Sequence, residues 1–380
     1  MHDLSLVIFS GIGILLVLLP LPLHWRARNA GTLLLIAWLF IANFIFFVDG
    51  IVWWNSYDLP PSPIWCDIAS KLFIGVPVGI SATSLCITRR LVMIASSTAV
   101  TITQRQKRIA LAVDLFLAIG MPVLVMALHY IVQAHRFDII EGYGCQPVTW
   151  PGVPALFAVT WWSPLLTIIA AGYGAIALRF FLYRRLQFHT VLRSSRSSLD
   201  SRHYLRLMAL ASVDIILGLP ATLFTLIVNI QQRRSYPSWD WVHLDWSRIE
   251  LYPASSILSD AQETIAIVLP RWLAPLLSII FFLFFGVSID AMGEYAKWYR
   301  AIRAKTPFLP FRREDILPIA APKLGSAIAK PSGADWKDST IANDDTLDGS
   351  YFNDLDRFDS TPGVVPGGIM VAVSVERAVV

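Results

Sequence analysis

The sequence predicts an all-α membrane protein: a seven-transmembrane helix bundle with its N-terminus outside and a disordered cytosolic C-terminal tail. Composition is the first reason, because 55% of the 380 residues are hydrophobic and only 15% are charged. Soluble domains carry about 25% charged residues. The apolar residues also form long runs, and the links between these runs alternate in charge. Mean hydropathy is accordingly high, at +0.57.

Seven stretches are long and apolar enough to cross a bilayer, which takes about 20 residues. The predicted spans are Leu4–Leu23, Gly31–Trp53, Ile68–Ser96, Ile109–Gln133, Val153–Tyr183, Tyr204–Ile230 and Thr264–Ser288. We expect the third and fifth, which exceed this length, to tilt or to extend beyond the lipid. Prolines inside the spans predict kinks, because each removes a helical hydrogen bond. They are Pro20, Pro77, Pro122, Pro164, Pro220, Pro270 and Pro275.

The charges of the links predict the orientation. The first, third and fifth links and the segment after the last span are basic, whereas the second, fourth and sixth links are neutral or acidic. Basic links stay on the cytosolic side, so every link predicts an N-terminus outside. The first run is followed, not preceded, by Arg26 and Arg28. This is the reverse of a signal peptide, so we expect an uncleaved span.

The chain divides into a predicted membrane domain, residues 1–303, and a cytosolic tail, residues 304–380. The stretch Asp335–Asp359 is rich in Asp, Ser, Asn and Thr and lacks helical periodicity, so we expect most of the tail to be disordered. The net charge of +4 comes from basic residues in the links. It therefore reflects membrane topology, and we expect the lipid bilayer and no nucleic acid as a partner.

The three cysteines differ in predicted location. Cys66 and Cys145 lie at the predicted outer face, where the oxidising environment allows a disulfide. We expect a bridge between them, and two free thiols are the alternative. Cys86 lies deep in the third span, where we expect it to pack as a small apolar residue.

Charged residues within the spans are candidates for function, because placing a charge in hydrocarbon costs several kcal/mol. Asp214 in the sixth span and Arg271 in the seventh lie at comparable predicted depths. We predict that they form an ion pair that acts as a latch between two states of the bundle, and that Pro220 on the sixth span is a hinge. The alternative is that each faces water or a backbone carbonyl.

Other polar residues near the ends of the spans give further expectations. Asp49 and Lys71 form a second candidate ion pair, whereas Asp114 lies close enough to the cytosolic edge to be solvated. Aromatic residues gather in the predicted external links, where they either anchor the protein at the headgroups or form a mouth for a partly apolar ligand. The candidate ligand-binding residues are Trp53, Trp54, Trp65, Lys71 and Trp150.

The residue patterns of common enzymes are missing from the sequence. It contains no glycine-rich phosphate loop and no HExxH, and only His129 lies clearly within a span, which is too few ligands for a membrane zinc hydrolase. The seventh span has no lysine for a retinal Schiff base. We therefore expect no enzyme, no metal and no cofactor. A transporter or channel is the alternative, although no internal repeat is visible.

Several short motifs occur in order along the predicted spans. They are Leu21–Gly31, Trp65–Ile68, Ser84–Leu91, Gly144–Pro147, Arg184–Phe188, Arg271–Trp272 and Phe281–Gly286. Together, up to about Arg303, they resemble the fungal a-factor-type receptors for lipopeptide mating pheromones. The resemblance implies a G-protein-coupled receptor in the plasma membrane that binds a farnesylated peptide and signals through a heterotrimeric G protein to a MAP-kinase cascade. It leaves open whether the receptor is a homodimer.

The resemblance also suggests a role for the basic residues at the predicted inner face. We expect the G protein to contact Arg89, Arg90, Arg184, Arg185 and Arg206. The alternative is that these residues reflect membrane topology and anionic lipid alone. At the outer face, a prenylated peptide combines an apolar tail with a short polar chain, which the aromatic mouth would receive.

Overall fold

The computed structural model describes residues 4–58, 63–96, 103–188, 198–257 and 261–305. These residues belong to one compact unit, Met1–Pro310. The second unit, Phe311–Val380, lies outside the described residues. The prediction of a disordered cytosolic tail falls almost entirely on that part of the chain, so it stays a prediction.

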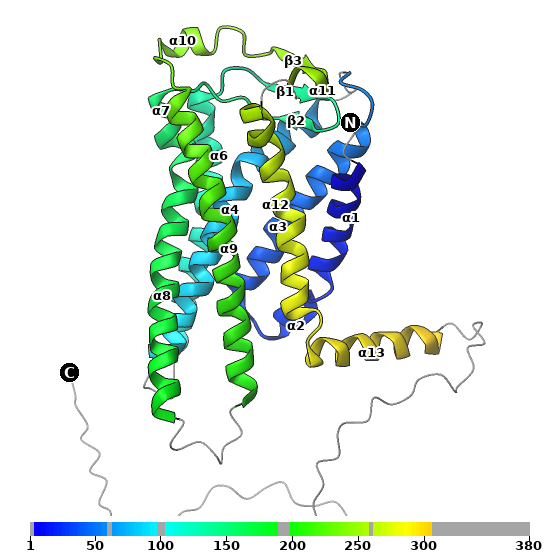
Figure 1. Ribbon diagram of the computed structural model, residues 1–380, viewed down its shortest axis with the longest axis vertical. Helices are drawn as coiled ribbons and strands as arrows, with labels where there is room; N and C mark the ends of the chain where they lie inside the picture. Colours follow the sequence, from blue (N-terminus) through cyan, green and yellow to red (C-terminus); the bar gives the residue numbers. More distant parts are fainter. Residues whose placement is uncertain (1–3, 59–62, 97–102, 189–197, 258–260, 306–380) are drawn as a thin grey trace, which may run out of the picture. The chain divides into compact units, whose positions relative to one another are not determined.

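Seven helices within the described ranges are long and apolar enough to cross a membrane, which confirms the predicted bundle. They lie side by side (Figure 1). In hydrocarbon no water can satisfy the backbone, so each span bonds internally as a helix. The spans are formed by α1 (Leu4–Leu18) with α2 (Leu21–Arg26), α3 (Ala30–Val52), α4 (Ile64–Ser96), the run of α5 (Gln104–Leu115), η1 (Phe116–Gly120) and α6 (Met121–Val132), α8 (Trp162–Phe188), α9 (Ser198–Gln231) and α12 (Ala261–Phe285).

Prolines interrupt or lie within most of these helices, as predicted. Pro20 lies between α1 and α2, Pro77 lies inside α4, and Pro220 lies inside α9. Helix α12 contains both Pro270 and Pro275. Two widened π-helical turns interrupt other helices: η1 follows α5, and η2 (Leu156–Thr160) follows α7 (Val153–Ala155). Each lies within two residues of a proline, Pro122 for η1 and Pro154 for η2. Such turns are most often found as local bulges in longer helices.

Large apolar side chains point outward from the spans. Leu15, Phe116 and Ile216 are 66%, 63% and 67% exposed. In water such a surface would promote aggregation, but lipid tails cover it at no cost. The core between the helices contains residues from distant spans, such as Leu39, Ile87 and Phe281.

A small β-sheet lies at one end of the bundle, which the all-helical prediction did not include. Its strands are β1 (Phe137–Ile140), β2 (Gly144–Gln146) and β3 (Ile249–Tyr252). β1 pairs antiparallel with β2 and parallel with β3, so the sheet joins the fourth link to the sixth. We call this sheet, with α10 (Trp239–Val242) and α11 (Ala254–Ile257), the cap (Figure 1).

A disulfide ties the cap to α4. Cys66 and Cys145 are bonded at 2.02 Å, which confirms the predicted bridge, and Cys86 is free and buried as expected. Asp49 of α3 lies beside the bridge, where it accepts hydrogen bonds from the Cys145 backbone N–H at 3.2 Å and from Trp65 Nε1 at 2.7 Å. The bridge joins residues 79 apart in sequence. Closing a loop of that length lowers the conformational entropy of the unfolded chain, which stabilises the fold by about 4.5 kcal/mol.

The opposite end of the bundle carries an additional helix, α13 (Ile289–Lys305), that follows α12 at a sharp angle (Figure 1). This helix was not expected from the sequence. Ser288 Oγ accepts a hydrogen bond from the Ala291 N–H at the start of this helix. Glu294 then pairs with Arg26 of α2 at 2.7 Å and with Lys297 at 2.8 Å. The Arg26–Glu294 ion pair holds the start of α13 against the first span.

Two glycines at the β1–β2 turn test the packing of the cap against Asp49 of α3. Gly142 and Gly144 both have positive φ, at 78° and 74°, so alanine strains the backbone at either position by about 1–2 kcal/mol. At Gly144 an added Cβ would also collide with Asp49, whereas at Gly142 it would meet nothing within 4 Å. We therefore expect Gly144→Ala to lower the melting temperature of the detergent-solubilised protein clearly more than Gly142→Ala. Labelling of the buried Cys86 thiol on heating measures unfolding, and equal losses would contradict the packing described here.

Candidate functional site

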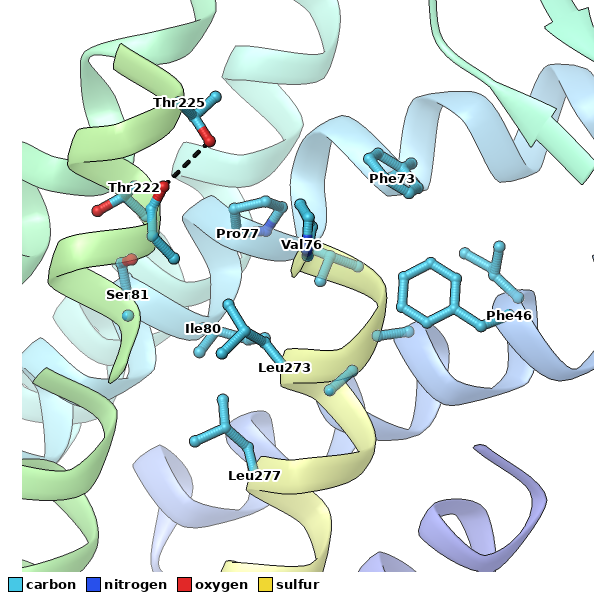
Figure 2. Close-up of a pocket in the computed structure, with 16 residues that line it drawn as sticks. Phe46, Phe73, Val76, Pro77, Ile80, Ser81, Thr222, Thr225, Leu273 and Leu277 are labelled. Atoms are coloured by element: carbon cyan, nitrogen blue, oxygen red, sulfur yellow. Dashed lines mark hydrogen bonds between the residues drawn. The ribbon is translucent and has the colours of Figure 1, made fainter. Parts of the chain in front are cut away.

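A mostly apolar pocket lies inside the bundle between α3, α4, α9 and α12 (Figure 2). We call it the bundle pocket. Its empty space, including the part open to the surroundings, is about 760 Å³. Phe46, Phe73, Ile80, Leu273 and Leu277 supply much of its wall. None of the described residues that line it is charged.

The hydroxyl groups in the wall do not make the bundle pocket polar, because each has a partner within the protein. Thr222 donates to the Leu219 carbonyl and Thr225 to the Ala221 carbonyl, both at 3.1 Å. Ser81 Oγ lies 3.0 Å from Thr167 Oγ1. The surface left for a ligand is therefore made of methyl groups, rings and aliphatic chains. It suits a hydrocarbon ligand better than a polar one.

The position of the prolines explains why space remains between these helices. Pro77 and Pro270 both line the bundle pocket from inside their helices. A proline in a helix interior removes a hydrogen bond and bends the helix away from close packing. The facing turn of α9, around Pro220, contributes the small residues Gly218 and Ala221. Bent helices and small side chains together leave the cavity.

Arg271 lies next to the bundle pocket, one residue beyond Pro270, and is only 1% exposed. Its guanidinium lies 5.9 Å from the Phe46 ring and 5.1 Å from the Phe73 ring, two rings that line the pocket. Nη1 donates to the Ile267 carbonyl at 2.8 Å and Nη2 to Gln146 Oε1 at 2.9 Å. A cation held by rings and carbonyls therefore lies between the bundle pocket and the cap.

The predicted Asp214–Arg271 pair stays a prediction, because the side chain of Asp214 lies outside the described residues. Its neighbours Leu210 and Ala211 pack in the same cluster as Phe281. Phe281 is ten positions beyond Arg271, roughly 15 Å along the helix. Among the described residues, Asp49 is the acid that attracts Arg271.

A second, polar pocket lies between α4 and α6 at the cap end of the bundle. Its empty space, including the open part, is about 820 Å³. Lys71 Nζ lies 3.0 Å from His129 Nδ1 and donates to Gln133 Oε1. Arg136 forms two parallel hydrogen bonds to Asp67, at 2.8 and 2.6 Å. The predicted pairing of Asp49 with Lys71 is therefore wrong. Asp49 of α3 bonds to Trp65 and Cys145, whereas Lys71 of α4 contacts His129.

Most of the tryptophans predicted to bind ligand pack against, or form hydrogen bonds with, other residues of the protein. Trp53 is 2% exposed and packs in a core cluster, and Trp65 donates to Asp49. Trp150 packs edge-on against Trp241 with ring centroids 5.1 Å apart. Neither pocket is lined by any of the four predicted tryptophans, which are Trp53, Trp54, Trp65 and Trp150. Their role in ligand binding stays a prediction. Lys71, by contrast, lines the polar pocket.

The arginines predicted to face the G protein differ in their surroundings. Arg89 Nη2 lies 2.6 Å from Asp114 Oδ1. Asp114 is only 5% exposed, so the expectation that it is solvated is wrong: the ion pair with the neighbouring helix allows its burial. Arg90 donates to Asn29 Oδ1 at 3.1 Å, and Arg206 is half-buried. The side chains of Arg184 and Arg185 lie outside the described residues.

A third charged cluster lies within the cap itself. His135 Nε2 lies 2.6 Å from Asp138 Oδ1, and Glu250 lies opposite Asp138 on the neighbouring strand. These three side chains converge closely enough to hold a metal ion. Arg248 already supplies a cation there, 3.2 Å from Glu250. Burial raises the pKa of Asp138, while its hydrogen bond with His135 opposes that rise. The cluster therefore joins β1 to β3 through its own charges.

Comparison with known proteins identifies the family to which this arrangement belongs. The family model "Pheromone A receptor" matches residues 5–305, which include all seven spans and α13. The chain belongs to the pheromone A receptor family. It is therefore a multi-pass membrane protein of G-protein-coupled receptor type, and its family is one of receptors, not of enzymes. This confirms the family predicted from the ordered motifs.

Several members of this family are similar over most of the present chain. The pheromone B beta 1 receptor of Schizophyllum commune is 38% identical over 283 residues, which cover 73% of this chain and 51% of that protein. Pheromone receptor 1 of Mycosarcoma maydis is 33% identical, with 77% and 83% covered. The pheromone a factor receptor of Saccharomyces cerevisiae is 26% identical, with 77% and 61% covered. The chain spans only about half the length of the Schizophyllum relatives.

The Arg89–Asp114 pair generates a stability prediction. Arg89→Gln leaves the Asp114 carboxylate buried without a cation, which costs roughly 3 kcal/mol, the lower end of the usual range because Arg89 is partly exposed. We expect Asp114→Asn to recover most of the loss in the double variant. Arg300→Gln, at an exposed cation on α13, serves as the control and leaves the melting temperature unchanged. A non-additive recovery in the double-variant cycle supports the pair, and simple additivity would contradict it.

Proposed function

We propose that this protein is a plasma-membrane receptor for a farnesylated peptide mating pheromone, and that it signals through a heterotrimeric G protein to a MAP-kinase cascade. Membership of the pheromone A receptor family supports the pheromone ligand. The bundle pocket carries the further step to a prenylated ligand, because it is an uncharged space enclosed by apolar side chains from four spans. A long hydrocarbon chain is the ligand chemistry that such a surface fits.

The pocket has to compete with the bilayer for the prenyl chain. A chain that is already dissolved in lipid gains little from further hydrophobic burial, since lipid tails are as apolar as the pocket. Binding must instead come from close packing, where each pair of atoms in contact contributes only ~0.1–0.2 kcal/mol but many pairs add up. The rings of Phe46 and Phe73 and the branched side chains of Ile80 and Leu273 provide such contacts.

The same geometry suggests how binding would reach the inner face. A ligand activates a receptor only by favouring one arrangement of the helices over another. The bundle pocket contacts α4 and α12 at Pro77 and Pro270, and it contacts α9 on both sides of Pro220. Filling it would therefore change the packing of α9 at its predicted hinge. The G protein would meet the moved helix ends near Arg206 and the arginines of the adjoining inner links.

The proposed orientation places the cap outside the cell. The cap contains the Cys66–Cys145 bridge, and disulfides form and persist in oxidising compartments. The opposite end of the bundle carries the basic residues Arg26, Arg89 and Arg90, as expected for the cytosolic side.

A pathway reporter tests the proposed function directly. Cells that carry this receptor are exposed to a panel of synthetic farnesylated peptides and to the same peptides without the farnesyl chain. We expect some of the prenylated peptides to activate the reporter and their unprenylated twins to need at least about 100-fold higher concentration, because the pocket then stays empty. Silence across the panel, with the receptor shown at the cell surface, would contradict the proposal.

Filling the bundle pocket tests its part in the response. Ala221→Leu adds bulk to the wall, and we expect it to raise the concentration of farnesylated peptide for half-maximal response about tenfold or more, since overpacking typically costs 1–3 kcal/mol. Ala175→Leu makes the same change on an exposed face of α8 and is the matched control. Equal responses of the two variants, at equal surface expression, would place the prenyl chain elsewhere.

A further inference from the structure

Lys71 has an incomplete set of partners in the polar pocket. An ammonium group has three N–H donors. Among the described residues two acceptors face it, His129 Nδ1 and Gln133 Oε1. His129 must then carry its proton on Nε2, which lies 2.9 Å from Thr149 Oγ1, so the imidazole is neutral. Neither partner supplies a negative charge, and one N–H of the ammonium is left for a ligand.

The neighbouring hydroxyl is also available. Ser70 lines the same pocket and is only 3% exposed. Its Oγ has no hydrogen-bond partner within the described part of the chain, although a buried hydroxyl ordinarily has one. Lys71 and Ser70 are adjacent in α4, and both contribute to the wall of the polar pocket. An ammonium and a hydroxyl are thus both present with bonding capacity left over.

The charges that line the pocket do not cancel. Lys71 and Arg136 contribute +2 and Asp67 contributes −1, which leaves a net charge of +1. The Arg136 charge is already balanced by its two hydrogen bonds to Asp67. The excess charge therefore belongs to Lys71. A partly buried cation without a counter-ion is unfavourable, and an incoming anion would relieve that cost.

We propose that the polar pocket binds a carboxylate of the pheromone peptide, with Lys71 Nζ as its ion-pair partner and Ser70 Oγ as a second donor. The inference rests on the proposed function and adds to it the chemistry of the peptide part: an acidic residue. Trp246 and Ser247, from the link that follows α10, line the same pocket from the cap side. Trp246 packs edge-on against Tyr130 at 4.8 Å, so the peptide would pass beside a fixed aromatic wall.

The site is separate from the bundle pocket. Asp67, Ser70 and Lys71 lie on one face of α4, whereas Phe73, Val76 and Pro77 line the bundle pocket from another face. Binding at the two pockets would therefore be distinguishable. The bundle pocket would set the dependence on the prenyl chain, and Lys71 would set the dependence on an acidic residue in the peptide.

Peptide and receptor changes together test this site. Farnesylated peptides that contain one Asp or Glu are compared with twins in which that residue is Asn, Gln or Lys, in the reporter assay and at equal receptor surface density. On the unmodified receptor we expect the acid-to-amide change to raise the half-maximal concentration about tenfold or more. On Lys71→Gln the acid and amide twins become equal. On Lys71→Glu the Lys-bearing twin becomes the better agonist.

Two further variants separate a binding role from a folding role. Ser70→Ala keeps the charge and is expected to weaken the acidic peptide by a smaller factor while leaving the amide twin unchanged. Arg233→Glu reverses an exposed charge outside the pocket and is the control for long-range electrostatics. If acid and amide twins act equally on the unmodified receptor, or if Lys71→Gln weakens both equally, the carboxylate site is overturned while the proposed function stands. If no farnesylated peptide acts at all, the proposed function fails and this inference fails with it.

Discussion

The cap end of this protein depends on one buried carboxylate, that of Asp49. It accepts hydrogen bonds from Trp65 at the start of α4 and from the backbone of Cys145 in the cap, next to the disulfide. Arg271 on α12 attracts the same carboxylate electrostatically, without a direct ion pair among the described contacts. A single side chain of α3 therefore bonds to both α4 and the sheet, and it attracts the cation of α12. Because a buried carboxylate is costly without such partners, these contacts favour the arrangement of the four elements seen here.

The two pockets lie on either side of α4 and have opposite character. Proline kinks and small residues leave the apolar one within the bundle, and an ammonium with neutral partners makes the other one cationic. A prenylated peptide has the same two parts, a hydrocarbon chain and a polar segment. Arg271 lies between the bundle pocket and the cap, because it contacts the Phe73 ring on one side and Gln146 of β2 on the other.

The features predictable from the sequence were those that do not depend on which side of each helix faces its neighbours. Span number follows from composition, and the Cys66–Cys145 bridge follows from having two cysteines on one face. The pairing of Asp49 with Lys71 was wrong because similar depth does not put two side chains on facing sides. Burial of Asp114 depends on Arg89 of another helix, and β1 pairs with a strand more than a hundred residues away. Pro77 and Pro270 were visible as kinks, but the rings of Phe46 and Phe73 look like any lipid-facing residue in sequence.

The central claim is that the hydrocarbon part of the ligand lies inside the bundle, between α3, α4, α9 and α12. The most direct measurement is photocrosslinking with an active peptide whose prenyl chain carries a diazirine, followed by mass spectrometry of the labelled receptor. We predict labels on the wall of the bundle pocket, at residues such as Phe46, Phe73 and Leu273, and their loss when unmodified farnesylated peptide competes. Labels that fall instead on outward-facing residues such as Leu15 or Ile216, or within the cap, would contradict the account.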